Sequence, residues 1–113
     1  MHELAIADAV LSMALEQAVD RRVARIGMRI GHLRQVVPSA LRFGFEMVAH
    51  HTRAEGAELE IEQIPVSVWC EQCREESGAS ALPLVCARCG TLDVAVRRGD
   101  EMLVDWIEVE EKE

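Results

Sequence analysis

Apolar and polar side chains recur with helical spacing near the start of the chain. From Leu4 to about Asp20, leucine and alanine return every three or four residues, with acidic and polar side chains opposite them. This pattern is typical of an amphipathic helix that buries one face. We expect the buried stripe to contain Leu4, Ala7, Leu11, Ala14, Leu15 and Ala18.

The period changes to two between Val23 and Ile30, which predicts a half-buried strand that ends at Gly31. A loop is expected over residues 32–37. Pro38 then suits the first turn of a second helix, which we expect to continue to about Arg53 and to end before Gly56.

Two further strands are expected, one around Leu59 and Ile61 that Pro65 ends, and one over Met102–Val109. Two helices and three strands predict a small α+β layer pair with both helices on one face of a three-stranded sheet. The expected domain comprises residues 1–65 and 100–113. Residues 66–99 form an inserted module.

All four cysteines lie in that module, as two Cys-x-x-Cys pairs separated by twelve residues. Two such turns can direct four thiolates at one ion, which favours a tetrahedral zinc site. Disulfides or metal-free thiols are the alternative, but nothing indicates an oxidising compartment. We therefore expect a structural zinc-ribbon site, on which folding of the module depends. Its ligands would be Cys70, Cys73, Cys86 and Cys89.

Composition limits the expected partners. The 113-residue chain is 50% hydrophobic and 4% aromatic, with a formal net charge of −8. Such acidity disfavours nucleic acid, because binding there depends on Lys and Arg neutralising phosphates. No apolar run is long enough to span a bilayer, and the first residues do not resemble a signal peptide. We expect a cytoplasmic protein without a nucleic-acid or membrane partner.

The first three residues, Met1, His2 and Glu3, form a second candidate metal site. The Met1 amine, deprotonated main-chain nitrogens and the His2 imidazole can present a planar set of nitrogens. That set suits Ni(II) or Cu(II) and does not suit tetrahedral zinc. Glu3 could add its main-chain nitrogen, or its carboxylate in an outer position. Alternatively, His2 simply leads the helix, with Glu3 as a favourable charge in the first turn.

The remaining histidines are weaker candidates. His50 and His51 are consecutive on the expected helix, so they would point about 100° apart and are not expected to share an ion. His32 is expected in a loop. No Ser-His-Asp arrangement, phosphate-binding glycine loop or isolated reactive cysteine is present in the sequence. The residues therefore do not indicate an enzyme.

Over essentially its full length, the sequence resembles the HypA/HybF family of hydrogenase maturation proteins, which deliver nickel. The resemblance rests on the Met-His-Glu start together with a four-cysteine insertion at this position. Further matching segments are Ile30-Gly31-His32-Leu33, Leu41-Arg42-Phe43, Glu55-Gly56-Ala57, Leu59-Glu60-Ile61-Glu62 and Ile107-Glu108-Val109-Glu110. Arg74 stands where the family often has Gly or Lys, and Ala87 where it often has Pro. Both differences affect turn geometry and leave the ligands unchanged.

The resemblance implies zinc in the cysteine site and Ni(II) bound by His2 with main-chain nitrogens that include that of Glu3. The inserted module lacks the histidine that some members use for nickel, so His32 or water would substitute. Family members work with a nickel-handling GTPase to load the large subunit of NiFe hydrogenase, and some serve urease maturation.

We therefore expect a nickel metallochaperone, as a monomer or weak homodimer. The alternative is a zinc-ribbon module that binds protein or nucleic acid. A zinc enzyme would need an open ligand position, which four cysteines do not leave.

Overall fold

The computed structural model describes residues 2–111 and forms two compact units. The first unit comprises residues up to Arg29, Val36–Glu62 and residues from Leu103 onward. The second comprises Ile30–Gln35 and Gln63–Met102. It therefore takes in a short segment before the second helix in addition to the cysteine-containing segment. The expected limits of 66–99 for the inserted module remain a prediction.

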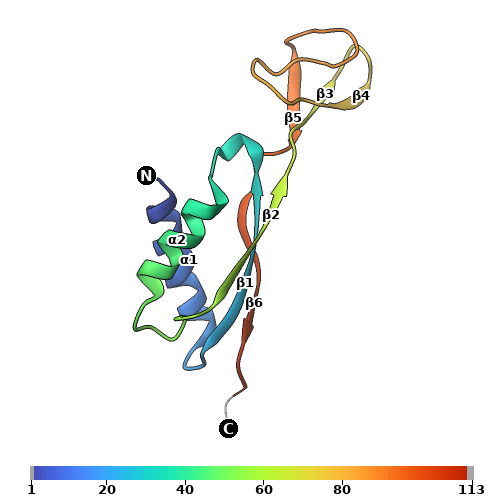
Figure 1. Cartoon of the computed structure of the whole chain (residues 1–113). Coiled ribbons are helices and arrows are strands. Elements are labelled where there is room, and N and C mark those ends of the chain that lie inside the picture. The colour runs from blue at the N-terminus through green and yellow to red at the C-terminus, as the bar shows by residue number, and fades with distance from the viewer. Residues whose placement is uncertain (1, 112–113) are drawn as a thin grey trace. The chain divides into compact units, whose positions relative to one another are not determined.

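The first unit contains two helices, α1 (His2–Ala18) and α2 (Pro38–Ala49), on one face of a three-stranded sheet (Figure 1). The strand order is β2 (Glu58–Ile64), β1 (Val23–Gly31), β6 (Met102–Val109). The last strand therefore joins the sheet beside the first. This arrangement confirms the predicted α+β class with two helices and a three-stranded sheet.

The buried face of α1 follows the predicted stripe with three differences, one of which is that Leu15 is only half-buried. Ala7, Leu11, Ala14 and Ala18 are buried as expected, and Val10 is buried with them. Leu4 is 50% exposed because its side chain lies in the first turn beside Gly44 of α2. Glycine has no side chain with which to cover it. Small residues thus allow the two helices to approach closely at this point.

Helix α2 begins at Pro38 as expected but ends at Ala49, four residues before the predicted end. The carbonyl oxygen of Ala49 accepts from the amide and the hydroxyl of Thr52, at 3.0 Å and 2.6 Å. In a continued helix that carbonyl would instead accept from Arg53. His51 adopts a φ of 66°, which takes the chain out of the helical conformation.

The polar face of the first sheet carries ion pairs between neighbouring strands. Arg25 of β1 contacts Glu60 of β2 at 2.9 Å and Glu108 of β6 at 3.0 Å. The Arg25 guanidinium also lies 5.5 Å from the ring centroid of Trp106. That ring covers Gly27, where an added Cβ would approach it within 2.1 Å. Gly27 therefore provides the space that Trp106 occupies.

The second unit is built on an antiparallel sheet with strand order β4 (Glu75–Gly78), β3 (Ser67–Cys70), β5 (Val94–Arg98). Val68, Cys70 and Cys86 are fully buried in it. Residues His32–Arg34, expected in a loop, form a short 3-10 helix. Within residues 2–111, neither α-helix has the length and apolar character required to cross a membrane.

The single aromatic side chain of the cysteine-containing segment, Trp69, already has partners on both its ring and its nitrogen. The Arg97 guanidinium lies 4.7 Å from the ring centroid, and the indole nitrogen donates to the Glu71 carboxylate at 3.1 Å. Both contacts lie within the second unit. They make this ring a poor platform for stacking a nucleic-acid base.

Candidate metal sites

The four cysteine sulfurs converge on one point of the second unit. The Sγ atoms of Cys70 and Cys89 are 3.7 Å apart, and those of Cys73 and Cys86 are 3.9 Å apart. All four atoms lie within 4.8 Å of one another. A tetrahedral zinc ion with bonds of about 2.3 Å would separate its sulfur ligands by about 3.8 Å. The site therefore fits zinc, and the sulfurs are too far apart for the disulfide bonds considered as an alternative.

Two equivalent turns position these sulfurs. The first connects β3 to β4, and the second precedes β5. In each turn, the first cysteine's carbonyl accepts a hydrogen bond from the amide four residues later. The Arg74 amide donates to Cys70 at 2.7 Å, and the Gly90 amide donates to Cys86 at 2.9 Å. Both donor residues have positive φ, 54° for Arg74 and 76° for Gly90. The two Cys-x-x-Cys pairs thus share one backbone conformation, for which Gly90 is the better suited residue.

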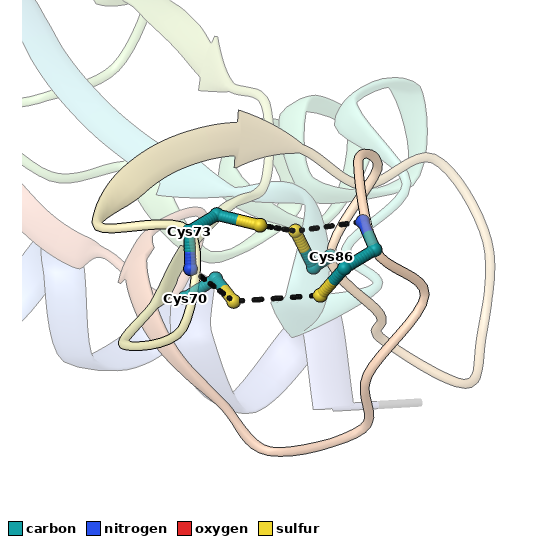
Figure 2. A group of neighbouring side chains, drawn as sticks. Cys70, Cys73 and Cys86 are labelled. Atoms are coloured by element: carbon teal, nitrogen blue, oxygen red, sulfur yellow. Dashed lines mark hydrogen bonds between the residues drawn. The ribbon is translucent and has the colours of Figure 1, made fainter.

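Main-chain amides also point at the sulfurs. The amide of Cys73 donates to Cys70 Sγ at 3.4 Å (Figure 2). The amide of Arg88 donates to Cys86 Sγ at the same distance. In Figure 2 the thiols of Cys70, Cys73 and Cys86 point toward a common centre. Such donors stabilise a negatively charged thiolate, which is the form that binds metal.

The thiols differ in acidity for this reason. Amides of Cys89 and Arg88 lower the pKa of Cys86 to about 6. Burial, reinforced by the neighbouring cysteine side chains, which favour the protonated thiol, raises the pKa of Cys73 to about 12. The amides thus favour the thiolate at Cys86, whereas burial favours the thiol at Cys73, and metal binding requires the thiolate form of both.

The structure places His2 as the first residue of α1, with 53% of its side chain exposed. Met1 lies outside the described residues. The first amides of an α-helix have no carbonyl partner within it, so the main-chain nitrogens of His2 and Glu3 are not needed for the helical ladder. A ligand could therefore use these nitrogens without breaking a helical hydrogen bond.

The Glu3 carboxylate connects the beginnings of the two helices. Its Oε2 accepts from the amide of Val37, the N-cap residue of α2, at 3.2 Å and lies 3.6 Å from Nε2 of His2. The hydrogen bond from Val37 is the main cause that lowers the pKa of Glu3 to about 2. The carboxylate is therefore ionised at any physiological pH and holds a position beside the imidazole.

The other histidines divide into two cases. His32 is exposed in the 3-10 helix of the second unit. His50 and His51 lie with Glu55 in a group whose ligand atoms are within 4.8 Å of one another. The expectation that His50 and His51 point too far apart to share an ion was wrong, because α2 ends before both residues. A positive φ at a non-glycine residue has no clear signal in the sequence, so the group could not be predicted.

Comparison with known proteins identifies the family. Residues 1–109 match the family described as "Hydrogenase/urease nickel incorporation, metallochaperone, hypA". Hydrogenase maturation factor HypA from Acidithiobacillus ferrooxidans is 36% identical, with 97% of this chain and all of the relative covered. HypA from Dechloromonas aromatica is 38% identical with the same coverage. HypA from Roseiflexus is 40% identical over 98% of this chain and 94% of the relative.

Two solved structures share the fold. The solution structure of the nickel metallochaperone HypA from Helicobacter pylori matches with a TM-score of 0.66 and 22% identity, covering 99% of this chain and 100% of that one. A second HypA solution structure matches with a TM-score of 0.71 and 23% identity, covering 97% of each chain. The resemblance seen in the sequence is thus confirmed over the whole chain. The protein belongs to the HypA family of hydrogenase and urease nickel-incorporation metallochaperones, which are metal carriers and not enzymes.

Proposed function

We propose that this chain binds one Ni(II) ion at its N-terminus and delivers it during maturation of NiFe hydrogenase. The ligands would be the His2 imidazole, the main-chain nitrogens of His2 and Glu3, and the Met1 amine. The observation that carries the proposal is the start of α1 at His2, which leaves these amides outside the helical ladder. A planar set of nitrogen ligands is one that Ni(II) prefers.

In this proposal the Glu3 carboxylate positions the site and does not bind the ion. It is already held by the amide of Val37 and lies beside Nε2 of His2. Nickel bound at this oxygen would compete with the hydrogen bond from Val37. The main-chain nitrogen of Glu3 can bind without such competition.

Zinc would be held by the four cysteines, where it would cross-link the two turns of the second unit. The sulfur spacing and the amides directed at Cys70 and Cys86 support this assignment. Because the unit has only a small buried core, we propose that it requires zinc to fold. Zinc would remain in place while nickel is passed on.

The proposed partners are a nickel-handling GTPase and the hydrogenase large subunit in the cytoplasm, with urease maturation factors as a further recipient. Reconstitution with purified GTPase and nickel-free large subunit would test this. Native chain should increase nickel incorporation, and the His2→Ala variant should not. Equal incorporation with both proteins would contradict a role for the N-terminal site in delivery.

The site itself is tested on untagged protein, since an N-terminal extension would block the amine. We expect Ni(II) to give the absorption of a planar nitrogen complex in the native chain and not in His2→Ala, while zinc content stays unchanged. Glu3→Gln should keep the planar complex, because its main-chain nitrogen remains. A planar nickel spectrum in His2→Ala would refute the site. Its loss in Glu3→Gln would contradict a complex formed by nitrogens alone, because the site would then require the charged carboxylate.

A further inference from the structure

The loop that follows α2 gathers three potential metal ligands on the surface of the first unit. His50 Nδ1 lies 2.6 Å from Oε2 of Glu55, and the rings of His50 and His51 have centroids 3.9 Å apart. One ligand atom from each residue lies within 4.8 Å of the others. All three residues are exposed, so an ion could reach them from solution.

These distances suit a small divalent ion. Ligands at about 2.1 Å from a metal are separated by about 3 Å when adjacent and about 4.2 Å when opposite. The observed separations therefore require only small side-chain rotations. Two imidazoles and one carboxylate are also the donor set that nickel, copper and zinc accept, whereas magnesium and calcium prefer oxygen alone.

Several contacts that fix the backbone of the loop do not use the three ligand side chains. Ala54 is fully buried, and the Thr52 hydroxyl bonds both the Ala49 carbonyl and the Ala54 amide. The Arg22 guanidinium donates to the Glu55 carbonyl at 2.9 Å, and the main-chain amide of His51 holds the Glu55 carboxylate beside the histidines. A loop held in this way presents its ligands with little loss of entropy on binding.

The conformation of His51 is a further indication. Its φ of 66° is a left-handed value that glycine adopts most easily, and a helix commonly ends on glycine at such a position. Here the chain places an imidazole there instead. The left-handed turn is what brings the rings of His50 and His51 to the same side as Glu55.

This group cannot complete the N-terminal site. The hydrogen bond between Glu3 and Val37 places the starts of α1 and α2 together. His50 and His51 follow the opposite end of α2, which is twelve residues long. At 1.5 Å per residue, that length is about 18 Å. The Arg53 guanidinium, which bonds the carbonyls of Leu15 and Arg21, confirms that the loop lies near the other end of α1.

We propose that His50, His51 and Glu55 form a second, surface metal site that binds a divalent transition ion of the nickel-to-zinc class through two imidazoles and one carboxylate. Water fills the remaining positions, so Ni(II) here is six-coordinate and paramagnetic. The planar nitrogen complex proposed at the N-terminus is diamagnetic. The two sites are therefore distinguishable in one sample.

The test is an Ni(II) titration of zinc-loaded, untagged protein, followed by calorimetry and by amide NMR spectra. We expect two nickel ions per chain, with paramagnetic broadening strongest for amides of residues 47–57 and extending to the segment around Arg22 that contacts this loop. The double variant His50→Gln/His51→Asn should bind one ion and lose the broadening. Asn is chosen at position 51 because it tolerates a left-handed backbone. His32→Ala, which removes an exposed histidine elsewhere, should still bind two.

Glu55→Gln gives a second, structurally milder variant and should weaken the surface site at least tenfold, while thermal unfolding shows that the chain is still folded with a slightly lower midpoint. Broadening absent from residues 47–57 in the native chain, or unaltered nickel binding in the double variant, would overturn the proposal. The His2→Ala variant separates this result from the proposed function, since it should retain the broadening and lose only the planar complex.

Discussion

Replacing Gly90 by Ala should weaken zinc binding through the backbone alone. Gly90 has a φ of 76°, and a Cβ added there would meet no atom within 4 Å. No steric clash therefore contributes. A left-handed conformation costs an alanine roughly 1–2 kcal/mol, and alanine recovers about 0.4–1 kcal/mol by restricting the unfolded chain. The net loss is about 1 kcal/mol.

Because folding of the second unit and zinc binding are proposed to be coupled, this loss should appear as an approximately fivefold lower zinc affinity. Arg74→Gly should not weaken zinc binding. Arg74 occupies the equivalent position in the first turn with a φ of 54°, a conformation that glycine adopts more easily than arginine. Gly78→Ala is the matched control, because Gly78 lies in β4 without a positive φ and its nearest neighbour to an added Cβ is 4.0 Å away.

Zinc affinity can be measured by competition with a chromogenic chelator, and stability by thermal unfolding of the same samples. We expect Gly90→Ala to lose affinity while Gly78→Ala does not. If Gly90→Ala bound zinc as tightly as the native chain, the left-handed turn would not be part of the metal-bound state. The same reasoning would fail if Gly78→Ala showed an equal loss.

Three other predictions address the two units. Removing zinc with a strong chelator should collapse the amide NMR dispersion of residues 63–102 and leave that of α1 and α2, whereas simultaneous loss of both would refute independent folding. Gly44→Ala should raise the midpoint of thermal unfolding, because the new Cβ would meet Leu4 at an ordinary 3.5 Å and alanine favours a helix by up to about 1 kcal/mol; a lower midpoint would show overpacking. Hydrogen bonding from Arg25 lowers the pKa of Glu108, so this pair stabilises the fold fully above the ordinary pKa of about 4.3, and the stabilisation is lost as the pH falls from there through the lower pKa of the folded state. Glu108→Gln should therefore lower the unfolding midpoint slightly at pH 7, and this difference should shrink as the pH falls below about 4. A difference that stays constant into acid would contradict the ion pair.

The parts of the fold that depend on periodicity could be predicted from the sequence. The alternation over residues 23–30 predicted β1, and the position of Pro38 predicted the start of α2. The spacing of the four cysteines predicted their convergence, because two short turns restrict where the sulfurs can point. Local pattern was sufficient in each of these cases.

Features that depend on tertiary contacts could not be predicted. The exposure of Leu4 follows from the absence of a side chain at Gly44 on a neighbouring helix. The end of α2 at Ala49 follows from the Thr52 hydroxyl, although Thr52 also fitted the helical period of the sequence. The metal-ligand group at His50 and His51 depends on that early end, so the helix error concealed it.

The fluorescence of the two tryptophans can report on the two units separately. The chain contains two tryptophans and no tyrosine, with Trp106 in the first unit and Trp69 in the second. Replacing either by phenylalanine leaves a single emitter. The Trp106→Phe protein would report on the surroundings of Cys70 through its sequence neighbour, and the Trp69→Phe protein on the helix-covered sheet. Intrinsic fluorescence could thus resolve events in the two halves of the molecule without any attached dye.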